Sequence, residues 1–188
     1  MQTVGRTINS IIFFLMSKFI IAYFLVVCSA LSCAQSSEEM LHPTFNKKLN
    51  MLQIGLPNHW VDISSENPDG PSTYINELYD EPGVLQISFS EYLKGEKPKP
   101  NYYDLIELSK NVGEKQEFGT LQITSSGDCN FGKYGVVQFS STKFPYISVW
   151  HISDGQNFIF ATFICSKSPS KDDINDVKRI LTSIKKAK

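Results

Sequence analysis

The chain has 188 residues, of which 41% are hydrophobic and 20% are charged, and its formal net charge is −1. This length leaves room for one globular domain and a targeting segment. Proteins that bind nucleic acids usually carry a concentrated basic face, so a composition this close to neutral argues against a nucleic-acid partner. The 13 phenylalanines and 8 tyrosines suit a sheet-rich core.

The amino-terminal segment has the order of a secretory signal. Residues 11–31 are apolar apart from Lys18 and two serines. Read from Met16, the segment has a basic start, an apolar stretch and then small residues, as secretory signal peptides do. We therefore predict that residues 1–34 direct export, with Met1 and Met16 both open as the initiator.

Three outcomes of processing remain open for this signal. Ser32 and Ala34 fit ordinary cleavage before Gln35. The Ala-Leu-Ser-Cys sequence at 30–33 also resembles a bacterial lipobox, in which Cys33 carries the lipid and begins the mature protein. A retained single-span anchor is the third outcome. All three place the domain outside the cytoplasm, as a periplasmic or outer-membrane lipoprotein, a secreted protein or a membrane-anchored one.

Residues 35–49 are polar and lack periodicity, so we interpret them as a linker to a single domain over residues 50–188. The domain opens with a period-two pattern from Leu52 to Leu56, which predicts a strand. Trp60 and the residue after it continue as a short extended piece.

A hairpin and a helix are expected next. Residues 74–78 and 84–90 flank an Asp-Glu-Pro-Gly turn, and the second segment alternates apolar and polar residues, which is typical of a strand with one buried face. Asn101 is a good helix N-cap, with Asp104 three positions further on. The amphipathic helix that begins there is predicted to end at Gly113.

More strands follow this helix. Residues 121–123 and 136–139 are predicted as strands, separated by a loop over 125–132. Asp154-Gly155 then lies between two β-rich runs, which is a strong short-range signal for a hairpin. The second run is apolar on both of its faces, so we expect cover on two sides.

A helix with an N-cap at Ser168 or Ser170 closes the chain, and its first turn is acidic. An apolar stripe along it is the natural cover for one face of the sheet: Ile174, Val177, Ile180, Leu181 and Ile184. We interpret the basic cluster at its carboxyl end as a complement to the helix dipole: Lys178, Arg179, Lys185, Lys186 and Lys188.

This order predicts an α+β fold, in which a mainly antiparallel sheet of six to seven strands is flanked by two helices as an α/β/α sandwich. With the tryptophan-bearing strand, the Asp-Gly turn, the aromatic strand and the closing helix, it resembles the PsbP-like fold over residues 50–186. That group includes an extrinsic photosystem subunit, a Ran-binding relative and small exported bacterial domains of unassigned role. The resemblance implies partner binding without catalysis, and no residue carries over as a photosystem or Ran contact.

Two cysteines lie within the domain, Cys129 in an expected loop and Cys165 at a strand end. An even pair in an oxidising compartment favours a disulfide, and two free thiols are the alternative. A bridge closing a loop of this size would contribute roughly 3–4 kcal/mol to stability.

The sequence contains no catalytic or metal-binding motif. The histidines His42, His59 and His151 lack metal-ligand spacing, and neither a CxxC nor a phosphate loop is present. We therefore expect no metal, no cofactor and no enzymatic activity. An enzyme would need a cleft that joins His59 or His151 to a carboxylate within hydrogen-bond reach.

Aromatic side chains are the candidates for recognition, because large amphipathic groups are favoured at binding surfaces. The candidate partner contacts, each with core packing as the alternative, are Trp60, Tyr74, Tyr79, Tyr102, Tyr103 and Trp150. The loops over 64–73 and 91–100 are further candidate contact segments.

The leading hypothesis is an exported, membrane-tethered binding module that contacts an unknown protein partner, as an assembly factor or an immunity-type protein. The alternative is a small-ligand-binding envelope domain with an apolar pocket between sheet and helix.

Overall fold

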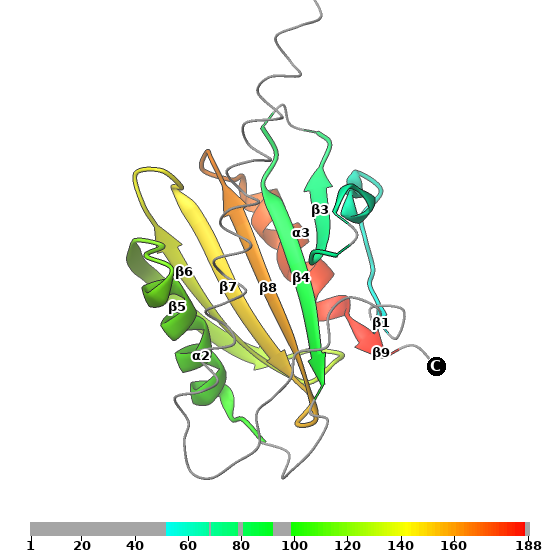
Figure 1. Cartoon of the computed structure of the whole chain (residues 1–188), viewed down its shortest axis with the longest axis vertical. Helices are drawn as coiled ribbons and strands as arrows, with labels where there is room; N and C mark the ends of the chain where they lie inside the picture. The colour runs from blue at the N-terminus through cyan, green and yellow to red at the C-terminus, as the bar shows by residue number, and fades with distance from the viewer. Residues whose placement is uncertain (1–51, 68, 79–80, 92–98, 187–188) are drawn as a thin grey trace, which may run out of the picture. The chain divides into compact units, whose positions relative to one another are not determined.

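The computed structural model describes residues 52–67, 69–78, 81–91 and 99–186 (Figure 1). The chain divides into two compact units after Met40, and all of these residues belong to the second unit. The predicted export signal with Cys33, the whole predicted linker and Tyr79 fall outside the described residues.

Seven strands form one antiparallel sheet in the order β2-β3-β4-β8-β7-β6-β5. Their bounds are β2 (Trp60–Asp62), β3 (Ser72–Asn76), β4 (Val84–Glu91), β5 (Thr120–Asp128), β6 (Lys133–Ser140), β7 (Tyr146–Ser153) and β8 (Asn157–Cys165). Two short strands, β1 (Leu52–Gln53) and β9 (Lys185–Lys186), pair separately, and a 3-10 turn, η3 (Ser64–Glu66), precedes β3. The predicted α+β fold with a mainly antiparallel sheet is confirmed.

Two helices, α2 (Tyr102–Lys115) and α3 (Lys171–Ser183), cover opposite faces of the sheet (Figure 1). Both begin with a capping box, in which the N-cap side chain and the carboxylate three residues on exchange hydrogen bonds with backbone amides. Asn101 and Asp104 cap α2, and Ser170 and Asp173 cap α3. Both predicted helix starts are confirmed.

The main core lies between the sheet and α3. The register places Leu85 opposite Phe163 and Trp150 opposite Ala161, so the inward residues of three neighbouring strands share one face. The predicted stripe of α3 supplies the other side of this core, and Ile180, its central residue, is fully buried. Burial of large apolar side chains is the main source of stability here.

The opposite face of β6 and β7 packs against α2, and two glycines allow this approach. A Cβ atom at Gly113 would overlap the ring of Phe139, and one at Gly135 would meet the backbone of Ile106. Gly113 is therefore inside the helix, which continues to Lys115. The prediction that this glycine ends the helix is wrong, because its missing side chain serves close packing.

Three further boundaries differ from the sequence prediction. β5 runs through most of the expected loop to Asp128, because that segment pairs with β6. The first strand is only two residues long, since β1 pairs with nothing but β9 among the described strands. The last helix ends at Ser183, which places Lys185 and Lys186 in β9 beyond its last turn.

Candidate functional site

Three of the aromatic residues proposed as partner contacts lie in the core. Trp60, Tyr74 and Trp150 are each about 5% exposed or less. The ring of Trp60 packs 6.0 Å from that of Phe163, and the ring of Trp150 packs 5.3 Å from that of Tyr134. The prediction of a contact role for these three is wrong, because their strands point them at the face that α3 covers.

Two other candidates, Tyr102 and Tyr103, are exposed, and Tyr103 keeps 68% of its surface. The hydroxyl of Tyr102 donates to the carboxylate of Asp128, with a distance of 3.0 Å to each oxygen. This hydrogen bond raises the pKa of Tyr102. The ammonium of Lys133 lies 5.1 Å from the centre of the Tyr102 ring. The first turn of α2 is thereby tied to the end of β5.

The predicted disulfide between Cys129 and Cys165 is absent, and both thiols are free. Cys129 follows β5 and bonds to Gly132, which touches the backbone of Ser153 at the end of β7. Cys165 pairs with Tyr146 at the start of β7. A strand of this length separates them by about 23 Å, far more than the Cα spacing of about 7 Å that a disulfide tolerates.

The contacts of His151 indicate a role in packing the sheet against α2. It is half-buried between α2 and β7, where burial lowers its pKa to about 3. Its Nδ1 atom lies 2.9 Å from the hydroxyl of Ser109, and its ring packs 5.0 Å from that of Phe160. The neutral imidazole therefore joins α2 to the sheet.

His59 does meet a carboxylate. Its Nε2 atom lies 2.6 Å from Oδ2 of Asp176, which also accepts from the indole of Trp60 at 3.2 Å. The other oxygen of Asp176 accepts from Arg179 at 2.8 Å. With three donors on one carboxylate, the cluster fastens β2 to α3. Among the described residues, no group of three His, Cys, Asp or Glu side chains is placed to hold a metal ion.

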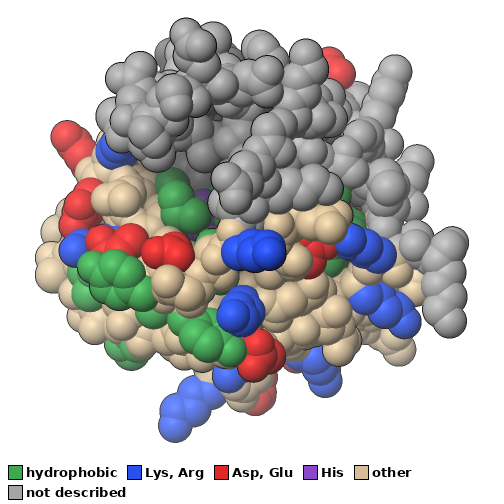
Figure 2. All heavy atoms as spheres, turned by 90° about the horizontal axis from the view of Figure 1, so that it is seen from below, with side chains coloured by type: hydrophobic (Ala, Val, Ile, Leu, Met, Phe, Trp, Pro, Cys, Tyr) green, Lys and Arg blue, Asp and Glu red, His purple; other side chains and the backbone are tan. Residues whose placement is uncertain are grey.

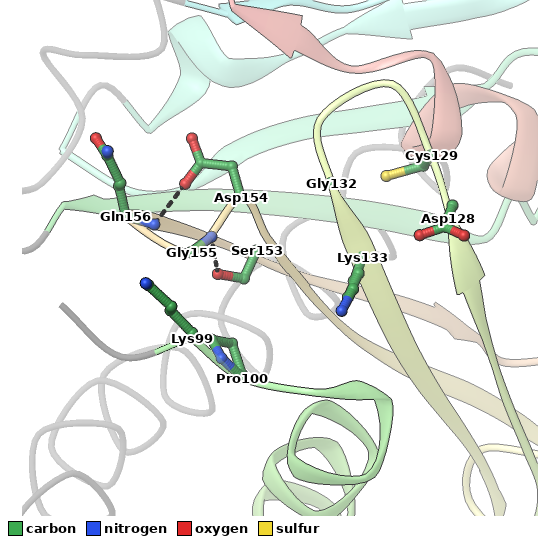
Figure 3. A pocket seen from close by; sticks show the side chains of 10 residues that line it. All are labelled: Lys99, Pro100, Asp128, Cys129, Gly132, Lys133, Ser153, Asp154, Gly155 and Gln156. Carbon is green, nitrogen blue, oxygen red and sulfur yellow. Dashed lines mark hydrogen bonds between the residues drawn. The ribbon is translucent and has the colours of Figure 1, made fainter.

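A groove of about 520 Å³ opens at one end of the sheet, where the β5–β6 and β7–β8 turns meet the segment before α2 (Figure 3). Neither histidine lines it. Six of its ten lining residues have charged or polar side chains, and it lies at the end of the sheet, so it differs from the expected apolar pocket between sheet and helix. Its lining includes Lys99, Asp128, Cys129, Lys133, Asp154 and Gln156.

One wall of this groove is a fixed turn. Gly155, at φ +83°, makes the bend between β7 and β8, and Asp154 accepts from the backbone amides of Gln156 and Asn157 at 2.7 Å each. Lys186 lies 2.6 Å from the same carboxylate. Burial alone would raise the pKa of Asp154, but the hydrogen bonds from Lys186 and the turn outweigh it and lower the pKa. Asp154 is thus already satisfied.

Lys99 and Lys133 are the two cations that line the groove, and the register sets Lys133 opposite Asp128 across the β5–β6 pair. Neither forms a salt bridge with any described carboxylate. Figure 3 shows them approaching the groove from two sides, Lys99 from the segment before α2 and Lys133 from β6. Seen from this end, the described surface carries lysine and arginine side chains interspersed with acidic and hydrophobic ones (Figure 2). The groove is therefore suited to an acidic group.

The edge strand β5 adjoins the groove. It pairs with β6 on one side and with none of the described strands on the other. Its residues are exposed almost throughout, and Ile123 keeps 56% of its surface. No charged residue or proline lies between Thr120 and Gly127, although edge strands are usually blocked by such residues.

Sequence reasoning predicted part of β5 but missed its role as a free edge. The signal present is an uncharged run of Thr, Ile and Ser that ends at Asp128. Strand order could not be read from that run, because an edge strand and an inner strand with polar residues look alike in sequence.

No protein-family model and no curated protein matches this sequence. LpqN and CyanoP are among the solved structures to which the chain is similar. LpqN of Mycobacterium tuberculosis, described as involved in cell envelope biogenesis, has 11% identity and a TM-score of 0.51, over 80% of this chain and 87% of LpqN. CyanoP, the cyanobacterial PsbP of Synechocystis, has 11% identity and a TM-score of 0.49, over 82% of this chain and 99% of CyanoP.

The likeness to LpqN shows a shared fold at a low level of identity. A PsbP protein is among the structures that the chain resembles, and the sequence analysis predicted a PsbP-like fold. Within the described part of the chain, neither α2 nor α3 is long and apolar enough to cross a membrane.

Proposed function

We propose that this protein is an exported, membrane-tethered binding module that acts through contacts with another protein and performs no catalysis. The observation that carries the proposal is β5, an exposed edge strand that is uncharged from Thr120 to Gly127, presents Ile123 to solvent and reaches the groove at Asp128. Edge strands of this kind are templates for pairing with another chain unless they are protected.

The surface around β5 adds two features that protein interfaces favour. Tyr103 and Ile123 are large exposed side chains, and interfaces are enriched in aromatic residues. The groove at the Asp128 end of β5 supplies polar and charged groups for a rim. Either an assembly factor or an immunity-type protein would use such a surface to hold one partner.

The envelope location rests on the amino-terminal signal and on the shared fold. LpqN is described as involved in cell envelope biogenesis, and this supports an envelope role for the present chain. In our proposal Cys33 carries the lipid, which makes the protein a periplasmic or outer-membrane lipoprotein. The intact mass of the mature protein tests this, because lipidation at Cys33 and cleavage before Gln35 give different masses.

Site-specific crosslinking tests the protein-binding role. A photoreactive amino acid replaces Ile123 in the full chain, which is then irradiated in its native membrane fraction. We expect one adduct of defined mass. The matched control carries the same group at Lys178, an exposed position on α3.

The two positions together decide the proposal. An adduct at position 123 that is absent at position 178 supports a partner on the β5 edge. Equal adducts at both positions, or none at position 123, contradict it.

A further inference from the structure

We infer that β5 takes up an extended segment of the partner protein as an additional strand, and that acidic residues at one end of this segment enter the groove beside Lys99 and Lys133. The inference rests on the proposed protein-binding function and specifies the chemistry of the partner. It follows from the backbone of β5, the register of its pairing with β6 and the charges of the groove.

The register identifies the part of β5 that can accept a strand. Pairing with β6 is irregular between Leu121 and Ile123, and it is regular from Ile123 to Asp128. A bulge bends a strand and disturbs its ladder, so the regular stretch offers the better template. That stretch leads directly to the groove, because Asp128 belongs to both.

The direction of the added strand follows from the sheet. Every neighbouring pair in it is antiparallel, and antiparallel pairing is slightly more stable per residue than parallel pairing. An antiparallel segment on β5 begins beside Asp128 and ends beside Ile123. Its amino-terminal end therefore lies at the groove.

The charges of the groove determine which residues suit the amino-terminal end of the partner segment. Asp154 is satisfied by Lys186, and Asp128 accepts from Tyr102. Lys99 and Lys133 form no salt bridge with a described carboxylate, although Lys133 lies opposite Asp128 in the register. A carboxylate directly opposite Asp128 would be repelled. The acidic residues therefore precede the paired residues and extend into the groove toward the two lysines.

The other end of the segment meets an apolar surface. Ile123 is 56% exposed and lies where the regular pairing stops. Cross-strand contacts between β-branched side chains stabilise antiparallel pairs. The partner segment is accordingly acidic at its start and β-branched and apolar towards its end.

The test uses the full chain in detergent and a labelled octapeptide, Asp-Asp-Thr-Thr-Val-Thr-Val-Thr, as the probe. A matched peptide begins with Lys-Lys. Fluorescence anisotropy measures affinity, and amide hydrogen exchange measures the backbone response. We expect the acidic probe to bind at least about tenfold more tightly than the basic one, and to slow exchange over 123–128 while β8 is unchanged.

Variants separate the edge from the groove. Lys99→Glu and Lys133→Glu should each weaken binding of the acidic probe by about tenfold, and Lys178→Glu, a charge reversal on exposed α3, should leave it unchanged. Ile123→Lys should weaken both probes, because a lysine on the edge opposes pairing. Its control is Leu78→Lys, at an exposed apolar residue after β3.

The contradicting results are distinct. Binding without slowed exchange in β5, or no binding at all, overturns strand addition. Equal binding of the two probes overturns the role of the two lysines. If crosslinking at position 123 still gives its specific adduct, the protein-binding proposal stands while strand addition fails; loss of that adduct removes the proposed function itself.

Discussion

Strands β5 and β8 are both nine residues long and belong to the same sheet, yet they have opposite environments. β8 lies between β4 and β7 and contributes Ile159, Ala161 and Phe163 to the core. β5 has a single neighbour and is exposed almost throughout. The place of β8 in the sheet gives it a role in stability, whereas the proposed function gives the exposed edge β5 a role in recognition.

The largest expected effect is a loss of packing in β8. Phe163 is 1% exposed, and Phe163→Ala should lower the free energy of unfolding by about 3–5 kcal/mol. Ile123→Ala, on the exposed strand, should change it by less than about 0.5 kcal/mol. Urea denaturation measures both. Similar losses at the two positions would mean that β5 belongs to the core.

The next effect is a pH dependence of the free energy of unfolding, which arises from His151 on β7. Burial holds the pKa of His151 at about 3, below its ordinary value of 6.5. Between pH 6.5 and pH 3 the imidazole is protonated in the unfolded chain and neutral in the folded chain. The contribution of His151 to the free energy of unfolding is therefore fully present above pH 6.5 and is lost as pH falls towards 3.

Between pH 3 and pH 6.5, His151 should change the free energy of unfolding by about 1.4 kcal/mol per pH unit. His151→Gln should flatten the slope even if it lowers stability overall, and denaturation at several pH values gives both quantities. An unchanged slope in the variant would show that the imidazole titrates normally in the folded protein.

A smaller effect is expected where β2 meets α3. Asp176 accepts from His59, Trp60 and Arg179. Asp176→Ala leaves the buried indole without its acceptor, so we expect a loss of about 1–3 kcal/mol in the free energy of unfolding. Asp172→Ala, at an exposed carboxylate on the same helix, is the matched control. Equal losses in the free energy of unfolding for the two substitutions would show that the hydrogen bonds of Asp176 do not stabilise the contact between β2 and α3.

The smallest effect concerns the two thiols, whose accessibility differs between the end of β5 and the end of β8. Burial raises the pKa of Cys165 to about 12, while Cys129 is half-buried at the groove. Iodoacetamide should label Cys129 in the folded protein and leave Cys165 unlabelled until urea is added. Peptide mass spectrometry reads each site separately, and a peptide pair linked by a disulfide would contradict the fold.

Much of the fold was predictable from local patterns. The Asp154-Gly155 turn, the capping boxes and the apolar stripe of α3 depend on neighbouring residues, and all are present. Gly113 was misassigned as a helix end, because its role depends on Phe139 across the interface. A glycine in a helical pattern can mark either the end of the helix or a close contact, and the sequence alone does not show which.

The candidate site was much less predictable. Tyr102 and Tyr103 were identified as aromatic candidates, but Trp60, Tyr74 and Trp150 were indistinguishable from them in sequence and are buried. Cys129 and Cys165 formed a plausible pair until the register placed them at opposite ends of β7. Strand order and register decide these cases, and both arise from long-range pairing.

The most direct test of the central claim compares amide hydrogen exchange of β5 in the purified full chain and in the native membrane fraction, with β8 as the internal reference. We predict that the amides of residues 123–128 that point away from β6 exchange rapidly in the purified chain and slowly in the membrane fraction, while β8 is protected in both. Equally rapid exchange of these residues in both samples would contradict a protein partner on the β5 edge.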